Sequence, residues 1–226
     1  EISAQEVADI SSLSCEMAAV DIAEVYSPKR FTALAEQFKL RPGFAIDLSE
    51  KKADGEFWNL NKPADVEELH NLLERDEPLL LTGSPPCNLF SRLQYISWYK
   101  LPPEVREKRM KEALHHLHTA CDAYEVQLNA DRYFLHEAPW SASSWNDERV
   151  ERIASRDDVY TVRGPMCKWG MQATDRRGLQ GNGYVRKETG WMTNHPGLAE
   201  LLQTECTNET GGAPWHRHIH LIGGIA

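Results

Sequence analysis

The sequence predicts an α/β fold, a doubly wound and mostly parallel sheet with a short C-terminal appendage. Short apolar runs alternate at least four times with segments of helical periodicity. These runs are continuously apolar, which is typical of parallel strands that helices cover on both faces. Hydrophobic residues make up 41% and charged residues 26% of the 226 residues. This composition excludes a disordered or repetitive chain.

The first half of the chain contains the clearest strand and helix patterns. We expect strands over 17–25, 43–47 and 78–82, and helices over 30–40 and 64–75. The second of these helices has acidic residues in its first turn, as helix starts prefer. The strand over 78–82 is the most apolar, and it runs into a turn with two consecutive prolines.

The second half continues the alternation. We expect helices over 103–129, 147–154 and 196–203, and strands over 133–137, 159–162 and 190–194. Residues 1–16 are a polar lead-in and 17–165 form the main domain. Residues 166–226 are expected to complete the sheet.

Candidate site residues follow from where the predicted strands end, because open α/β sheets bind ligands outside the carboxyl ends of their strands. The first strand ends at Glu24 and the second at Asp47. The third leads to Cys87 and the fourth ends at Glu137. A carboxylate at Asp47 can hold ribose hydroxyls or cap a turn, and both interpretations stay open.

Cys87 and Glu137 are the candidates for chemistry. Two prolines fix the backbone before Cys87, and rigid presentation suits a nucleophilic thiol, although a buried structural cysteine is the alternative. Apolar neighbours would favour the protonated form of Glu137, an acid catalyst, whereas a cap or ion-pair role is the simpler reading. Trp140 and Trp145 follow, and could stack a base or pack in the core.

These residues carry a family resemblance. Residues 83–91 read Gly-Ser-Pro-Pro-Cys-Asn-Leu-Phe-Ser, similar to the Gly-x-Pro-Pro-Cys-Gln-x-Phe-Ser motif of DNA (cytosine-5)-methyltransferases. More closely, the whole chain resembles the methyltransferase-like domains embedded in retrotransposon polyproteins of dinoflagellate type, in which five motifs recur in order. Here they are Glu-Val-Tyr-Ser-Pro (24–28), Ala-Ile-Asp-Leu (45–48), Ser-Pro-Pro-Cys (84–87), Phe-Leu-His-Glu (134–137) and Thr-Gly-Trp-Met-Thr-Asn (189–194).

The resemblance implies a Rossmann-like fold, S-adenosylmethionine as cofactor, and methyl transfer to cytosine C5 in nucleic acid, DNA in preference to RNA. Cys87 would add to C6 of a base outside the stack, and Glu137 would contact N3. The implied cofactor-binding residues are Glu24, Tyr26, Ser27, Asp47, Ser84 and Pro85. The substrate-binding residues are expected to be Asn88, Ser91, Arg92, Arg176 and Arg177.

Departures from the family pattern keep other functions open. The usual Phe-x-Gly-x-Gly loop is replaced after the first strand by Tyr26-Ser27-Pro28, and the segment after Gly178 is short for a large target-recognition domain. The chain could therefore be a catalytically degenerate methyltransferase fold, a binding or scaffold module of a polyprotein. Methyl transfer to a small molecule is the third interpretation. The intact Cys87 and Glu137 favour the enzyme.

The C-terminal region contains a candidate metal site. Two thiolates and two imidazoles are a ligand set typical of tetrahedral structural zinc. Histidines at alternate positions would share one face of a strand, so we expect the ligands to be Cys167, Cys206, His218 and His220, with His216 beside them. A solvated histidine-rich tail is the alternative.

Charge and cysteine content bear on partners and location. The 34 acidic and 25 basic residues give a net charge of −9, so a local basic patch or another domain must hold nucleic acid. The chain begins at Glu1 without a methionine, and we expect it to belong to a longer polypeptide. Five widely spaced cysteines indicate a reducing compartment, nuclear or cytoplasmic. No apolar run reaches the roughly 20 residues of a membrane span.

Overall fold

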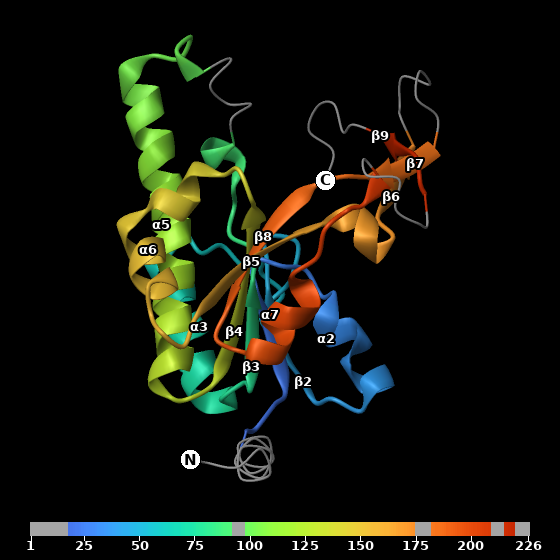
Figure 1. Cartoon of the computed structure of the whole chain (residues 1–226). Coiled ribbons are helices and arrows are strands. Elements are labelled where there is room, and N and C mark those ends of the chain that lie inside the picture. The colour runs from blue at the N-terminus through green and yellow to red at the C-terminus, as the bar shows by residue number, and fades with distance from the viewer. Residues whose placement is uncertain (1–17, 92–97, 175–181, 209–214, 220–226) are drawn as a thin grey trace.

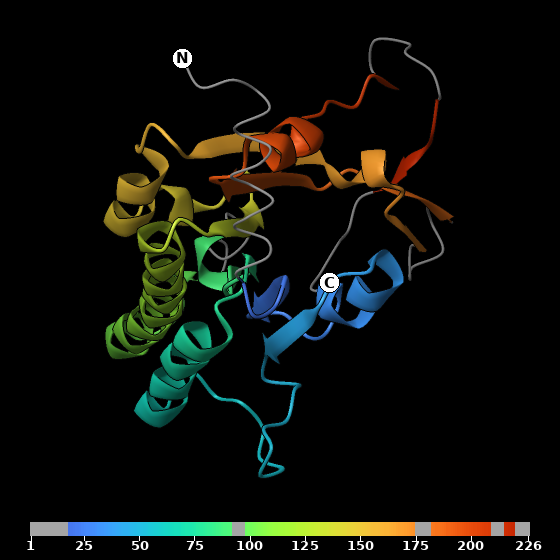
Figure 2. The same cartoon turned by 90° about the horizontal axis from the view of Figure 1, so that it is seen from below.

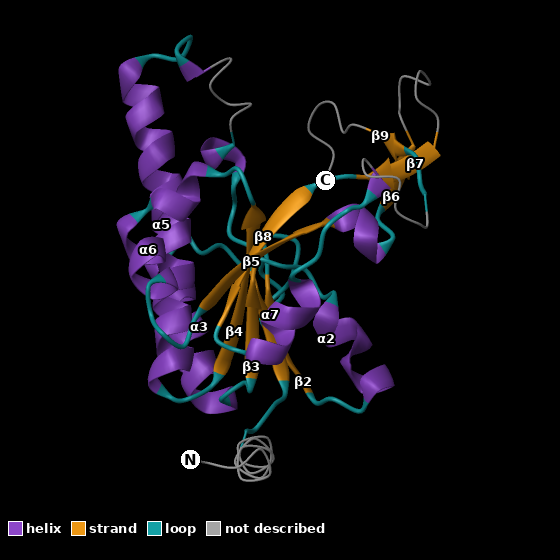
Figure 3. Cartoon of the chain, in the orientation of Figure 1, coloured by secondary structure: helices purple, strands orange, loops and turns teal. Residues whose placement is uncertain are grey.

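A six-stranded mixed sheet forms the centre of the molecule (Figures 1 and 3). The computed structural model describes residues 18–91, 98–174, 182–208 and 215–219. The strand order is β2-β1-β3-β4-β8-β5. The strands are β1 (Ile22–Val25), β2 (Pro42–Ile46), β3 (Leu80–Gly83), β4 (Tyr133–Pro139), β5 (Tyr160–Pro165) and β8 (Glu188–Thr193). The first four pair in parallel, whereas β8 is antiparallel to both β4 and β5.

Helices lie on both faces of this sheet (Figures 1 and 2). The five described helices are α2 (Phe31–Leu34), α3 (Pro63–Asp76), α5 (Pro103–Asn129), α6 (Glu148–Ala154) and α7 (Pro196–Leu202). Helices α3, α5 and α6 lie on one side, and α2 and α7 on the other. The α/β class predicted from the sequence is confirmed, and the sheet is mixed.

The core explains why the central strands are rich in apolar residues. All four residues of β1 are buried, as expected for a strand with neighbours on both edges and helices on both faces. Tyr124 of α5 stacks on Phe134 of β4, with ring centroids 4.8 Å apart, and both side chains are fully buried. These contacts fix the long helix against the centre of the sheet.

Several element boundaries differ from the sequence prediction. The helix expected over 30–40 is split into α2 and a 3₁₀ turn, Ala35–Phe38, which ends at Lys39 with a φ of 60°. The strand expected over 190–194 is β8, inserted between β4 and β5. Its antiparallel direction makes the sheet mixed, and a local apolar pattern does not encode strand direction.

A second, three-stranded sheet was not predicted. It has the order β6-β7-β9 and consists of β6 (Gln172–Thr174), β7 (Asn182–Val185) and β9 (His218–Ile219). It lies beyond one end of β5 and β8, away from the main sheet (Figure 1). The polar, glycine-containing sequence of β6 and β7 gave no strand signal, because these strands bury few apolar side chains.

The strand order defines where a ligand would bind. Strand β1 has β2 on one side and β3 on the other. The connection after β1 therefore leads toward β2, whereas the connection after β3 leads in the opposite direction, toward β4. Such a reversal opens a crevice at the carboxyl ends of the strands. No helix among the described residues is long and apolar enough to cross a membrane.

Candidate functional site

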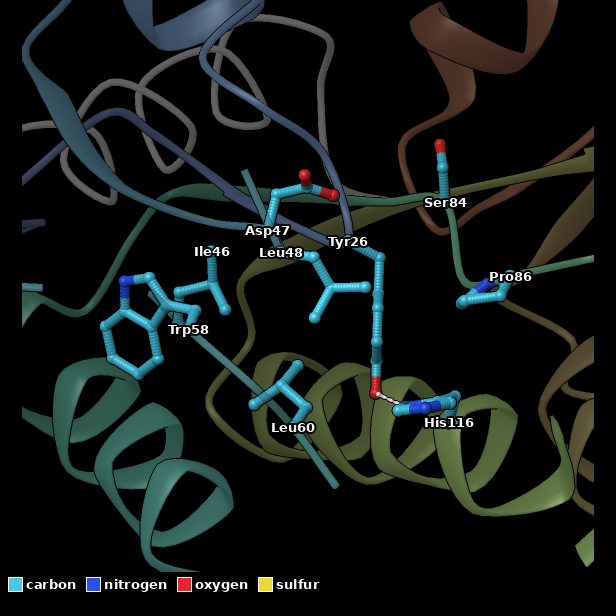
Figure 4. Close-up of a pocket in the computed structure, with 9 residues that line it drawn as sticks. All are labelled: Tyr26, Ile46, Asp47, Leu48, Trp58, Leu60, Ser84, Pro86 and His116. Carbon is cyan, nitrogen blue, oxygen red and sulfur yellow. Dashed lines mark hydrogen bonds between the residues drawn. The ribbon is translucent and has the colours of Figure 1, made fainter. Parts of the chain in front are cut away.

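A pocket lies at the carboxyl ends of β1, β2 and β3, where the strand order reverses (Figure 4). It contains about 470 Å³ of space that protein atoms leave empty, including its open mouth. Apolar and aromatic side chains supply most of its wall. The lining residues are Tyr26, Ile46, Asp47, Leu48, Trp58, Leu60, Ser84, Pro86 and His116. A largely apolar crevice with a few polar groups is typical of small-molecule sites.

Tyr26 is the residue that shapes this pocket from β1. Its φ is 56°, a left-handed conformation that is uncommon outside glycine. Its side chain extends toward α5, where the hydroxyl lies 3.1 Å from Nδ1 of His116 (Figure 4). Burial raises the pKa of the Tyr26 hydroxyl far above its ordinary value. Tyr26 is therefore a neutral wall of the pocket.

Glu24, a predicted cofactor-binding residue, is not among the residues that line the pocket. Its carboxylate is completely buried. It accepts hydrogen bonds from the Ser27 hydroxyl, the Arg30 amide, and both the amide and the hydroxyl of Thr32, at 2.7–3.0 Å. Ser27 is likewise buried, and also donates to the carbonyl of Pro28. Both side chains hold the loop that replaces a glycine-rich turn, and Ser27 is likewise absent from the pocket lining.

Asp47 lines the pocket and also caps a turn, so the turn-capping interpretation is confirmed and ribose binding stays a prediction. Its Oδ1 accepts hydrogen bonds from the amide and the hydroxyl of Ser49, at 2.9 and 2.7 Å. Its Oδ2 accepts no hydrogen bond from any residue that the structure describes. The turn thus fixes one carboxylate oxygen and leaves the other for a ligand.

The turn after β3 contributes to both the pocket and the reactive groups. Ser84 and Pro86 line the pocket, whereas Pro85 is buried and is not among the lining residues. Cys87 is half-buried and directly precedes a 3₁₀ turn, Asn88–Phe90. The rigid corner predicted from the two prolines therefore brings Cys87 next to the pocket.

Cys87 lies within the electrostatic reach of Glu137 and Lys187. Burial, followed by the negative charge of Glu137, raises the pKa of the Cys87 thiol, whereas the positive charge of Lys187 lowers it. Lys187 Nζ lies 3.0 Å from Glu137 Oε1. The two predicted catalytic residues are thus brought together, with a lysine that sequence reasoning missed. Because 50 residues separate Lys187 from Glu137, no local pattern indicates their pairing.

His136, directly before Glu137, belongs to the buried interior. Its Nδ1 lies 3.1 Å from the Tyr124 hydroxyl, and its Nε2 is buried without a hydrogen-bond partner among the described residues. Burial lowers the pKa of His136 to about 4. Gly83 faces the Tyr124 hydroxyl so closely that a Cβ would clash with it. The glycine at the end of β3 is therefore required for this packing.

The two tryptophans after Glu137 have different environments. Trp145 packs against the core and donates from Nε1 to the carbonyl of Pro139 at 2.9 Å. Trp140 is 40% exposed, and the Arg163 guanidinium lies 5.7 Å from its ring centre. Core packing therefore describes Trp145, while Trp140 presents an accessible aromatic face.

The predicted substrate-binding residues are only partly described. Asn88 is exposed at the start of the 3₁₀ turn after Cys87, and the Ser91 amide donates to its carbonyl. Both follow the candidate nucleophile, as expected. Arg92, Arg176 and Arg177 lie outside the described residues.

A cluster of two cysteines and two histidines lies at the second sheet. One ligand atom from each of Cys167, Cys206, His216 and His218 falls within 4.8 Å of all the others, so the cluster could hold a metal ion. Three of these residues were predicted ligands. His216 takes the place expected for His220, which lies outside the described residues.

Sequence reasoning missed much of the pocket wall. Trp58, Leu60 and His116 come from a loop and from a helix distant in sequence. An apolar residue pattern indicates burial but does not distinguish a pocket wall from the core. No protein-family model and no curated protein matches this sequence.

Proposed function

We propose that this chain is an S-adenosylmethionine-dependent methyltransferase that acts on C5 of cytosine in nucleic acid, DNA in preference to RNA. One observation carries the proposal: the turn 84–87 serves two adjacent sites. Ser84 and Pro86 line the apolar pocket, and the thiol of Cys87 is influenced by Glu137 and Lys187. A binding pocket and a thiol–carboxylate pair therefore share one edge of the sheet.

The pocket has the chemistry expected for a nucleoside cofactor. Trp58, Leu60 and Tyr26 offer apolar and aromatic surface for a flat heterocycle. Asp47 offers a carboxylate oxygen to ribose hydroxyls at the end of the second strand, the position typical of such contacts. The left-handed backbone at Tyr26 supplies a tight turn after β1 without glycine. A tight turn at this place therefore does not need the glycines of the Phe-x-Gly-x-Gly loop, whose absence is the main departure from the family pattern.

The reactive residues have definite tasks in this mechanism. S-adenosylmethionine, when bound, supplies an electrophilic methyl group. The Cys87 thiolate adds to C6 of cytosine, and the new C–S bond makes C5 nucleophilic. Glu137 contacts N3, and a proton held between its free oxygen and N3 stabilises the electrons displaced there. After C5 gains the methyl group, loss of the C5 proton returns the electron pair to the ring and expels the Cys87 thiolate.

Lys187 supports this chemistry from β8. Its ammonium group donates a hydrogen bond to Oε1 of Glu137, whereas Oε2 accepts no hydrogen bond from any described side chain or amide. Lys187 therefore orients the carboxyl group toward a substrate. Its charge also lowers the pKa of Cys87, which favours the attacking thiolate.

A catalytically degenerate binding or scaffold module is the second candidate. One observation favours it: burial and Glu137 together raise the pKa of Cys87 above its ordinary value. Without substrate the thiol is protonated at neutral pH. Because the net charge is −9, binding of nucleic acid would also require a local basic patch or another domain. Methyl transfer to a small molecule would remove that second difficulty.

Calorimetric titration with S-adenosylmethionine and its demethylated product tests the pocket. We expect micromolar one-to-one binding, weakened by about 1–3 kcal/mol in Asp47→Ala because a charge-assisted hydrogen bond is lost. Asp54→Ala is the matched control, since Asp54 forms the same turn contact, accepting from the Glu56 amide at 2.9 Å, outside the pocket. Equal weakening in both variants, or no binding by folded protein, would contradict the cofactor assignment.

Covalent capture of a 5-fluorocytosine oligonucleotide tests Cys87. Fluorine at C5 cannot leave as a proton does, so the enzyme should remain attached to the methylated base. Capture should require the cofactor and should be abolished in Cys87→Ala, with the fold checked by circular dichroism. Capture that persists in folded Cys87→Ala would remove this residue from the mechanism.

A further inference from the structure

The second sheet contains side chains whose arrangement the methyltransferase chemistry does not explain. Cys206 Sγ lies 3.4 Å from His218 Nε2 and 3.6 Å from His216 Nε2. The two imidazole nitrogens are 3.0 Å apart. Cys167 Sγ completes the group within 4.8 Å of each of the others. Two thiols and two ring nitrogens therefore converge on one point.

We propose that Cys167, Cys206, His216 and His218 bind one zinc ion with a structural role. Zinc–sulfur bonds of about 2.3 Å and zinc–nitrogen bonds of about 2.0–2.1 Å, in a tetrahedron, separate neighbouring ligand atoms by roughly 3.3–3.8 Å. The separations around Cys206 fall in this range. Four protein ligands leave no open position, which is typical of structural rather than catalytic zinc.

The donor set selects the metal by its chemistry. Thiolates are soft ligands and exclude magnesium and calcium, which take oxygen donors. Two sulfurs with two imidazoles in a tetrahedral arrangement are characteristic of zinc. Neither a carboxylate nor an amide belongs to the group.

The ligands come from three segments that the metal would fasten together. Cys167 lies in the 3₁₀ turn after β5, Met166–Trp169, and Cys206 follows α7. His216 and His218 lead into β9, which pairs with β7 through Tyr184 and His218. Side-chain contacts from Asn208 bracket the backbone of His216. One ion would thus tie the C-terminal strand to the main sheet.

The second sheet needs such a tie because its apolar core is small. Among its described residues, only Val185 and Ile219 are buried apolar strand residues, with Cys167 packed nearby. Short strands with so little buried area are marginal without a further stabilising contact. A metal bound in the folded state alone adds its binding free energy to folding.

The same tie holds the segment that carries Lys187. The amide of Met166, beside Cys167, donates to the carbonyl of Lys187 at 2.9 Å. The Val185 amide, at the end of β7, donates to the carbonyl of Met171 at 2.9 Å. The ion would therefore stabilise the backbone on both sides of the lysine that contacts Glu137. This inference does not depend on methyl transfer.

Metal analysis of the whole chain, purified under reducing conditions without chelator, tests the proposal. We expect about one zinc per chain, and loss of that zinc in Cys206→Ser together with a lower Tm. Cys87→Ser and His70→Ala are the matched controls and should retain the metal. Wild-type protein without zinc, or folded Cys206→Ser that keeps zinc at the wild-type level, would overturn the proposal.

Cobalt substitution covers the outcome that Cys206→Ser fails to fold. Wild-type protein depleted of zinc and given Co²⁺ alone should develop intense visible bands of a tetrahedral ion and thiolate-to-cobalt absorption in the near ultraviolet. Zinc should then displace the cobalt and remove these bands. Weak octahedral bands, or a Cys167–Cys206 disulfide found by mass spectrometry in the reduced preparation, would overturn the site.

Discussion

The carboxylates at the ends of β1 and β4 are the same group in two opposite environments. Glu24 is completely buried and accepts four hydrogen bonds from its own loop. Glu137 retains 22% of its side-chain exposure and contacts one lysine, whose side chain is 36% exposed. A buried carboxylate whose two oxygens both accept hydrogen bonds from the loop around it maintains architecture. One with an oxygen to spare, beside a thiol, is available for chemistry.

Replacing each glutamate by glutamine tests this comparison with the largest expected effect. In Glu24→Gln the amide NH₂ must face a donor, because both carboxylate oxygens accept hydrogen bonds. We expect a loss of about 2–4 kcal/mol in the free energy of unfolding, since buried donors are left unsatisfied. In Glu137→Gln the loss should stay below about 1 kcal/mol, because the ion pair with Lys187 is open to solvent on one side and such pairs contribute little.

Urea unfolding followed by circular dichroism at pH 7 measures both values. A variant of Glu24 that is as stable as wild type would show that its hydrogen bonds are not needed for the loop. A large loss in Glu137→Gln would assign that carboxylate a structural role as well. The comparison between Glu24 and Glu137 holds only if Glu24→Gln lowers the free energy of unfolding clearly more than Glu137→Gln does.

His136, the residue before Glu137, allows the contrast between a buried and an accessible polar group to be tested at lower pH. Burial lowers the pKa of His136 from its ordinary 6.5 to about 4, so the unfolded chain binds a proton that the folded chain rejects. Stability contributed by neutral His136 is present above pH 6.5 and is lost as pH falls toward 4. By pH 5 this one group should cost about 2 kcal/mol.

The variant His136→Asn isolates that contribution. Asparagine keeps a polar atom near the position of Nδ1 for the Tyr124 hydroxyl, and it does not titrate. The variant should be less stable at pH 7, but its free energy of unfolding should fall less steeply between pH 7 and 5. Parallel pH dependences for wild type and variant would mean that the pKa of His136 is the same in the folded and the unfolded protein.

The sequence predicts the fold class and the shared edge of the site because both depend on local patterns. Apolar runs mark the buried strands, and two prolines before Cys87 mark a rigid corner. The inserted position of β8 and the contact of Lys187 with Glu137 depend on long-range pairing. The burial of Glu24 could not be predicted either, because a strand-end carboxylate has the same local sequence whether its loop folds over it or not.

The smallest expected effect tests whether charge controls the reactivity of the Cys87 thiol, which follows β3. Because the pKa of Cys87 lies above its ordinary value, its alkylation by iodoacetamide should accelerate about tenfold per pH unit from 7 to 8. Glu137→Gln removes a charge that raises this pKa, and should speed alkylation about two- to tenfold. Lys187→Met removes one that lowers it, and should slow alkylation by a similar factor.

Peptide mapping by mass spectrometry follows Cys87 separately from the other four cysteines. Lys168→Met is the matched control, because Lys168 is exposed and has no part in the causes that shift the Cys87 pKa. If Glu137→Gln and Lys187→Met changed the alkylation rate in the same direction, altered access to the thiol rather than charge would explain the reactivity. Opposite changes would show that the charges of Glu137 and Lys187 act on the Cys87 thiol in opposite directions.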